Sequence, residues 1–153
     1  MRVAPPLHEY KRLYGLWVDP KPFSPMGSGG PIACRARTGG SDSRQAAGGT
    51  GTTVRFNMNR DARVIFVIER ALVGRERSGG RCTVTAYARK KGKRCIRWDY
   101  AGRFEYAGVK GGNTFRFSGR MKDGALPAGR YRLRGIAIGE IVDQAIVRFR
   151  ISG

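Results

Sequence analysis

Hydrophobic and polar residues alternate along most of the chain beyond Gly51. In TTVRFNM, residues 52–58, Val54, Phe56 and Met58 share one side and polar residues take the other. Because successive side chains of a β-strand point to opposite faces, this period of two predicts half-buried strands. The same alternation directs further residues toward a core: Val84, Ile96, Trp98, Tyr100, Phe104, Tyr106, Phe115, Phe117, Tyr131, Leu133, Val147, Phe149 and Ile151.

Other segments complete an all-β pattern. RVIFVIER, residues 63–70, is apolar on both faces, as expected of a central strand. LYGLWV, residues 13–18, predicts a first strand, which the three prolines of DPKPFSP end. Some seven or eight short strands separated by glycine-containing turns predict an antiparallel sandwich or barrel. We expect one domain over residues 13–153, after an extension of residues 1–12 and with a long Gly/Ser-rich loop at 26–51.

The run LPAGRYRL, residues 126–133, favours an immunoglobulin-like sandwich. It places Tyr131 just after a turn and at the start of a strand, where a tyrosine corner occurs. The ring would enter the core while the hydroxyl bonds back to the turn backbone. We therefore interpret Tyr131 as a structural residue.

A wider succession of segments supports this interpretation. VRFNMNRDARVIFVIER is followed by a Gly-rich turn, then GRC, a basic loop and RC, then FEYAGVKGGNTFRFSGR and LPAGRYRL. This succession, over roughly residues 52–152, resembles the Ig-like repeats found, often C-terminally, in secreted and surface proteins of GC-rich Gram-positive bacteria. The resemblance implies an Ig-like sandwich, an extracellular or cell-surface location, and a non-catalytic structural or adhesive role.

The three cysteines allow several interpretations. Val84 and Ile96 are expected on facing strands with RKKGKR as their turn, so Cys82 and Cys95 can form a disulfide there or remain two reduced thiols. The resemblance favours the disulfide, which leaves Cys34 as an unpaired thiol. Cys34, Cys82, Cys95 and His8 equal a Cys3His zinc set in number, but not in the close ligand pairs of structural zinc sites. We expect no metal and no cofactor.

Basic residues outnumber acidic ones, 30 to 11, and the formal charge is +19. Such a charge favours anionic polymers as partners. Two sets of cations are candidate binding residues: the turn residues Arg89, Lys90, Lys91, Lys93 and Arg94, and the outward-pointing Arg132, Arg134, Arg148 and Arg150. Protection of the sheet against aggregation is an equal alternative for both sets.

Catalysis has little support in this sequence. The chain contains one His, scattered acidic residues and no G-x-S-x-G, Walker A or Rossmann run. Trp98 and Tyr100 share one face of a strand, and we expect them in the core, as a buried Trp is in many sandwiches.

No run of 18 apolar residues suggests a membrane span, and no signal peptide is visible in this chain. We expect a non-enzymatic Ig-like module of a cell-surface or extracellular assembly. Its cationic face would meet anionic polymer or a neighbouring subunit. The alternative is a nucleic-acid-associated protein, or a structural subunit of a large particle, with a cytoplasmic location.

Overall fold

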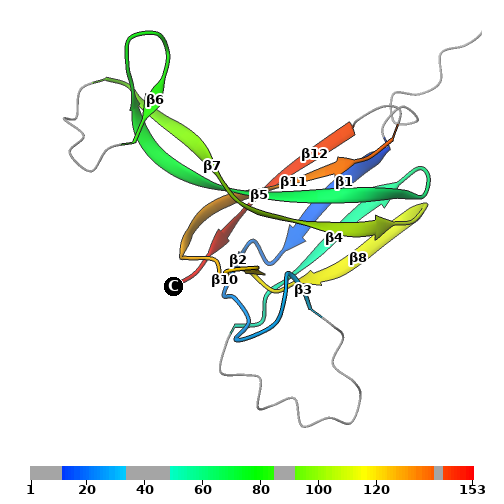
Figure 1. Cartoon of the computed structure of the whole chain (residues 1–153). Helices are drawn as coiled ribbons and strands as arrows, with labels where there is room; N and C mark the ends of the chain where they lie inside the picture. The colour runs from blue at the N-terminus through cyan, green and yellow to red at the C-terminus, as the bar shows by residue number, and fades with distance from the viewer. Residues whose placement is uncertain (1–11, 34–48, 85–91, 140–142) are drawn as a thin grey trace, which may run out of the picture.

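The protein is all-β, as the alternation predicts. A computed structural model describes residues 12–33, 49–84, 92–139 and 143–153, which fold into packed, largely antiparallel sheets (Figure 1). Twelve strands occur in these residues: β1 (Leu13–Asp19), β2 (Pro22–Phe23), β3 (Ile32–Ala33), β4 (Thr52–Met58), β5 (Ala62–Glu76), β6 (Cys82–Thr83), β7 (Arg94–Gly108), β8 (Gly111–Phe117), β9 (Arg120–Met121), β10 (Gly124–Ala125), β11 (Gly129–Ala137) and β12 (Asp143–Ile151). Seven of them have seven or more residues, which agrees with the predicted number.

Two sheets form the body of the molecule. The first has the order β1-β4-β8-β3. The second, called the larger sheet below, has the order β2-β12-β11-β5-β6, and β7 also pairs with β5. β12 and β2 run parallel, whereas β11 is antiparallel to both β12 and β5. A short β9–β10 hairpin lies beside the sheets.

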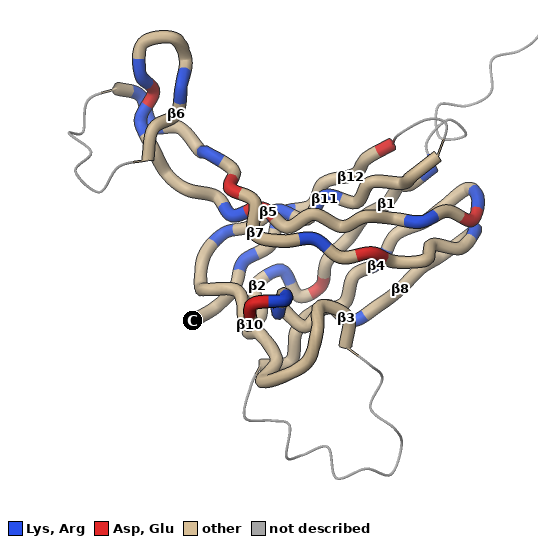
Figure 2. Tube along the Cα trace, in the orientation of Figure 1, with Lys and Arg blue, Asp and Glu red and all other residues tan. Residues whose placement is uncertain are grey.

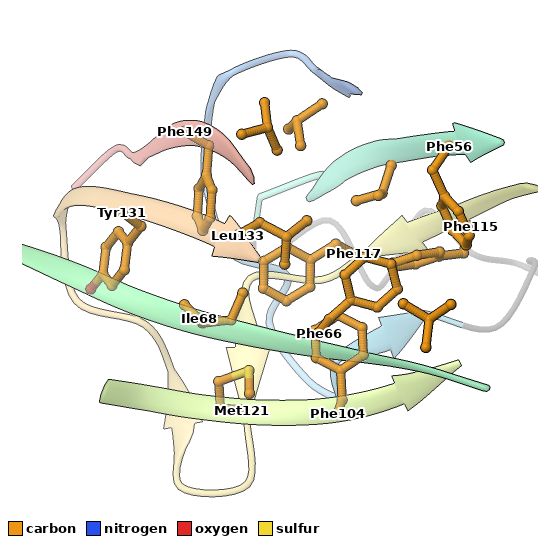
Figure 3. Packing of buried hydrophobic residues seen from close by; sticks show 14 of the residues in the cluster. Phe56, Phe66, Ile68, Phe104, Phe115, Phe117, Met121, Tyr131, Leu133 and Phe149 are labelled. Carbon is orange, nitrogen blue, oxygen red and sulfur yellow. The ribbon is translucent and has the colours of Figure 1, made fainter. Parts of the chain in front are cut away.

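The core between the sheets is rich in aromatic rings (Figure 3). Phe66 of β5 lies 5.4 Å from the Phe56 ring, 5.3 Å from Phe104 and 5.2 Å from Phe115, measured between ring centroids. Each fully buried ring contributes about 1.5–3 kcal/mol through removal of apolar surface from water. This cluster, drawn from both sheets, fastens them face to face.

The inward positions predicted from the alternation are largely confirmed. The buried residues include Val54, Phe56, Met58, Phe104, Phe115, Phe117, Tyr131, Leu133, Val147, Phe149 and Ile151. β5 has β7 on one side and β11 on the other, as expected of a strand that is apolar on both faces. Ile96 and Tyr100 are exceptions, because both are exposed, and Val84, Trp98 and Tyr106 are only partly buried.

The pair β5–β7 extends past the body as a projecting arm (Figure 1). Both strands have 15 residues, and their ladder continues from Ala62↔Gly108 to Arg75↔Arg94. β11, in contrast, pairs with β5 only as far as Arg70. We call residues 71–84 and 92–98 the arm. Among the described residues no second sheet covers its strands, and Val73 and Ile96 there are exposed to solvent.

A disulfide between Cys82 and Cys95 braces the arm. This pairing confirms the prediction, but the expected hairpin between the two cysteine strands is wrong. The ladder partner of Ile96 is Val73 of β5, and β6 pairs with β5 as well, through Glu76↔Cys82. The two cysteines therefore join strands that both pair with β5.

Gly74 makes this arrangement possible. A Cβ atom there would lie 2.6 Å from the Thr83 carbonyl oxygen and 2.9 Å from the Cys82 Sγ atom. Both separations are shorter than normal van der Waals contact, so no larger residue fits beneath the disulfide without a shift.

The predicted loop at 26–51 is anchored at both ends. The Met26 amide donates to the Ser118 carbonyl at 2.8 Å, and the Gly51 amide donates to the Ser24 carbonyl at 3.1 Å. Within the segment, β3 pairs with β8 through Ile32↔Phe117. Residues 34–48, and the extension except Arg12, lie outside the described residues.

Candidate polyanion-binding face

Five arginines lie on the outer face of β11 and β12, and we call them the arginine face. They are Arg130, Arg132, Arg134, Arg148 and Arg150. Their neighbours Tyr131, Leu133 and Phe149 are buried on the inner face, so the arginines point away from the core. Four of them were predicted as candidate binding residues. Arg130 joins the set because its ladder partner is Arg150.

Two direct cross-strand pairs on this face consist of like charges. Arg132 is the ladder partner of Arg148, and Arg130 is the ladder partner of Arg150. Like charges directly opposite each other destabilise an antiparallel ladder. The arginine face therefore has a structural cost that salt-bridged charges of mixed sign would not have. Figure 2 shows the Lys and Arg positions along β11 and on the arm.

Trp98 lies beneath two of these arginines. The Arg132 guanidinium carbon is 4.4 Å from the Trp98 ring centroid, and that of Arg148 is 5.4 Å away. Trp98 belongs to β7 and its ladder partner is Ala71, so the indole reaches over β5 toward β11 and β12. Cation–π attraction and contact with the ring hold both guanidinium groups in place.

The prediction that Trp98 and Tyr100 lie in the core is wrong. Trp98 is only partly buried, and the Tyr100 side chain is 66% exposed. The reason is a register shift in the β5–β7 ladder: Ile68 pairs with Gly102 but Glu69 pairs with Tyr100, which leaves one extra residue on β7 and reverses the faces beyond it. Both lie near the start of the arm and face the outer side of the larger sheet, together with their partners Ala71 and Glu69.

Glu69 is the acidic group that balances part of the arginine face. Its Oε1 accepts a hydrogen bond from Arg132 Nε at 2.8 Å and one from Arg134 Nη1 at 3.4 Å. The Arg132 hydrogen bond lowers the pKa of Glu69 below its ordinary value, and burial opposes this shift less strongly. Arg134 also donates to the side-chain oxygen of Gln144 at 2.9 Å.

The remaining arginines have guanidinium groups available for a ligand. Within the described residues, Arg130, Arg148 and Arg150 have no side-chain hydrogen bond or ion pair. Arg148 makes a cation–π contact with the Trp98 ring. A guanidinium fork matches phosphate and carboxylate oxygens in bidentate geometry. The arrangement is suited to binding anionic groups spaced along a polymer.

Apolar side chains continue this face onto the arm. Val73 and Ile96 are ladder partners, 56% and 48% exposed, and lie on the same side as Trp98 and Tyr100. Ile146, the ladder partner of Arg134, is also exposed. The outer face therefore combines cations with exposed apolar and aromatic surface.

Two of the cations predicted for the RKKGKR turn, Lys93 and Arg94, lie near the arm tip. Lys93 and Arg94 are exposed, and the Lys93 carbonyl accepts a hydrogen bond from the Glu76 amide at 2.9 Å. Arg89, Lys90 and Lys91 lie outside the described residues. Their role in binding stays a prediction.

Tyr131 occupies the position of a tyrosine corner. Its hydroxyl donates to the Pro127 carbonyl oxygen at 2.6 Å, while the ring is 1% exposed and stacks on Phe149. Burial raises the pKa of Tyr131, and the nearby Arg70 opposes that shift. The buried hydroxyl is thus satisfied by the turn that precedes its strand.

A cavity of about 300 Å³ lies between the base of the arm and the β9–β10 hairpin. Arg70, Asp99, Met121 and Asp123 contribute to its lining. Asp99 is already bound by Arg97 at 2.8 Å, and Arg70 donates to the Ala128 carbonyl at 2.9 Å. The Arg70 bond joins β5 to the turn before β11, whereas Arg97 and Asp99 both belong to β7.

No group of three or more metal-ligating side chains occurs among the described residues. The Cys3His interpretation fails in any case, because Cys82 and Cys95 are consumed by the disulfide. Cys34 and His8 lie outside the described residues. In the same described part of the chain, no helix has the length and apolar character needed to cross a membrane.

Comparison with known proteins assigns neither a family nor a function to the chain. No protein-family model matches the chain, and no curated protein is similar to it in sequence.

Proposed function

We propose that this protein is a non-catalytic Ig-like module of a cell-surface or extracellular assembly, and that its arginine face binds an anionic polymer. The observation that carries the proposal is the pair of successive cross-strand contacts Arg130↔Arg150 and Arg132↔Arg148. A face that only needed to stay soluble would intersperse charges of both signs. Like-charged neighbours are stabilised when an anionic ligand lies between them.

The immunoglobulin-like part of the proposal rests on three features. The sheets pack face to face around an aromatic core, Tyr131 bonds back to Pro127, and β11 and β12 pair in one sheet. The Cys82–Cys95 disulfide supports an oxidising compartment, because such bonds persist outside the cytosol.

A nucleic-acid-associated protein, or a subunit of a large particle, is the second candidate. The exposed Tyr100 favours nucleic acid, because an aromatic ring beside cations offers a stacking surface for bases. The projecting arm favours a particle subunit, since it presents Val73 and Ile96 to a neighbour.

Binding of inorganic polyphosphate over a range of salt concentrations tests the leading proposal. We expect the double variant R130A/R150A to bind at least about tenfold more weakly and to show a flatter salt dependence. The matched control is R55A/R60A, which removes the same charge from exposed positions away from the arginine face. Equal losses in both double variants would mean that net charge alone drives binding, and would contradict the proposal.

A further inference from the structure

We infer that the polymer bound by the arginine face is a single-stranded nucleic acid, and that Tyr100 is the platform on which a base stacks. This inference rests on the proposed function and concerns the same face. Two features of the face indicate this ligand: a track of cations and an exposed aromatic ring.

The first kind is a track of cations. Arg130, Arg148 and Arg150 have free guanidinium forks among the described residues, and they lie on two adjacent strands. Phosphates of a nucleic-acid backbone are natural partners for such a track. Trp98 contributes by fixing Arg148 and Arg132 from below, at 5.4 Å and 4.4 Å from its ring, so these groups need little ordering when the ligand binds.

The second kind is exposed aromatic surface. Trp98 is engaged by two guanidinium groups, whereas Tyr100 is 66% exposed and has no ring contact within the described residues. An anionic polymer without apolar groups would gain nothing from this ring. A polymer that joins phosphates to flat bases matches both the cations and the ring.

The spacing of the strands suits a nucleotide. Tyr100, Glu69 and Arg132 occupy one rung on β7, β5 and β11. Two interstrand spacings, about 10 Å, therefore separate the backbones of Tyr100 and Arg132. The long arginine side chains and the sugar between phosphate and base can bridge that interval. Glu69 does not repel the phosphates strongly, because Arg132 and Arg134 bind it.

A single strand fits better than a duplex. Bases in a duplex are stacked on each other and paired, so their faces are not available to Tyr100. Unpaired bases present a free aromatic face without requirement for a particular sequence.

The experiment measures the full-length, disulfide-bonded chain by fluorescence anisotropy against three probes: a labelled oligo(dT), a labelled DNA duplex and inorganic polyphosphate as competitor. We expect oligo(dT) to bind more tightly than the duplex. Y100A should weaken oligo(dT) binding about tenfold and leave polyphosphate binding unchanged, and Y100W should restore oligo(dT) binding. The matched control Y14A removes an exposed tyrosine from the other sheet and should change neither affinity.

The outcomes separate this inference from the proposed function. If R130A/R150A weakens both ligands but Y100A weakens neither, the face binds polyanions without base stacking and only the inference is overturned. Equal or tighter binding of the duplex would also overturn it. If R130A/R150A changes neither affinity relative to the R55A/R60A control, the proposed function itself fails.

Discussion

The guanidinium group of Arg132 lies 4.4 Å from the centre of the Trp98 ring, although the two residues belong to strands on opposite sides of β5. This contact ties the arm strand β7 to the body strand β11 across the strand between them. The same contact therefore supports the base of the arm and orients Arg132 of the arginine face.

Truncation of Trp98 should destabilise the fold. We expect W98A to lower the free energy of unfolding by about 2 kcal/mol, because it removes two cation–π contacts and partly buried apolar surface. Urea unfolding measures the change. W17A is the control, since Trp17 is 51% exposed and contacts one cation, Lys21, at 4.6 Å. The control should lose less than about 1 kcal/mol, and a loss equal to that of W98A would argue against the bridging role.

Neutralisation of Glu69 should remove a pH-dependent contribution to stability. The folded-state pKa of Glu69 lies below its ordinary value of 4.5, so its contribution is fully present above that pH and is lost as the pH falls through the folded pKa. We expect E69Q to unfold about 1–2 kcal/mol more easily at pH 7, with the difference shrinking below pH 4.5. Urea unfolding at several pH values measures both effects.

E105Q is the matched control for this change. Glu105 faces Arg63 at 3.7 Å, and both side chains are more than half exposed, so this pair should contribute almost nothing. A pH-independent effect of E69Q, or an equal effect of E105Q, would contradict the role assigned to Glu69.

Removal of the disulfide should loosen the arm before it loosens the core. Closing a loop of this length stabilises by up to about 3 kcal/mol, but here both cysteines lie in the projecting arm. In C82S/C95S we expect faster amide hydrogen exchange at Glu76 and Arg77, whose amides bond to the Lys93 and Arg81 carbonyls. Exchange at Phe66 in the core should stay slow. Unchanged exchange at Glu76 would show that the disulfide does not hold the arm tip.

Loss of the Tyr131 hydroxyl should weaken the turn before β11. Y131F leaves the Pro127 carbonyl without its 2.6 Å donor and should reduce the free energy of unfolding by about 1 kcal/mol. Thermal or urea unfolding measures it. Y106F serves as the control, because the Tyr106 ring stacks on Phe115 and its hydroxyl makes no hydrogen bond within the described residues. A smaller loss in Y131F than in Y106F would count against the tyrosine corner.

Much of the fold could be predicted because it depends on local order. The alternation in 52–58 and 145–151 specifies which side chains share a face, and all of the inward residues it named there are buried. The outward side of β11 and β12 followed from the same alternation. The disulfide required more than local order, and the predicted pairing was right while the expected ladder was wrong.

The sequence by itself determined the strands, their two faces and the surplus of cations, because these depend on residue type and a period of two. Only the tertiary structure decided which faces are covered. The β5–β7 ladder shifts register between Ile68 and Glu69, so Phe104 shares the inner face with Phe66 whereas Tyr100 shares the outer face with Glu69 and is exposed. Register between distant strands then brought Arg132 and Arg148 onto Trp98. Periodicity assigns a side chain to one side of its strand only while the ladder stays regular, whereas the register between strands and the packing of a second sheet determine whether that side chain is in the core or on the surface.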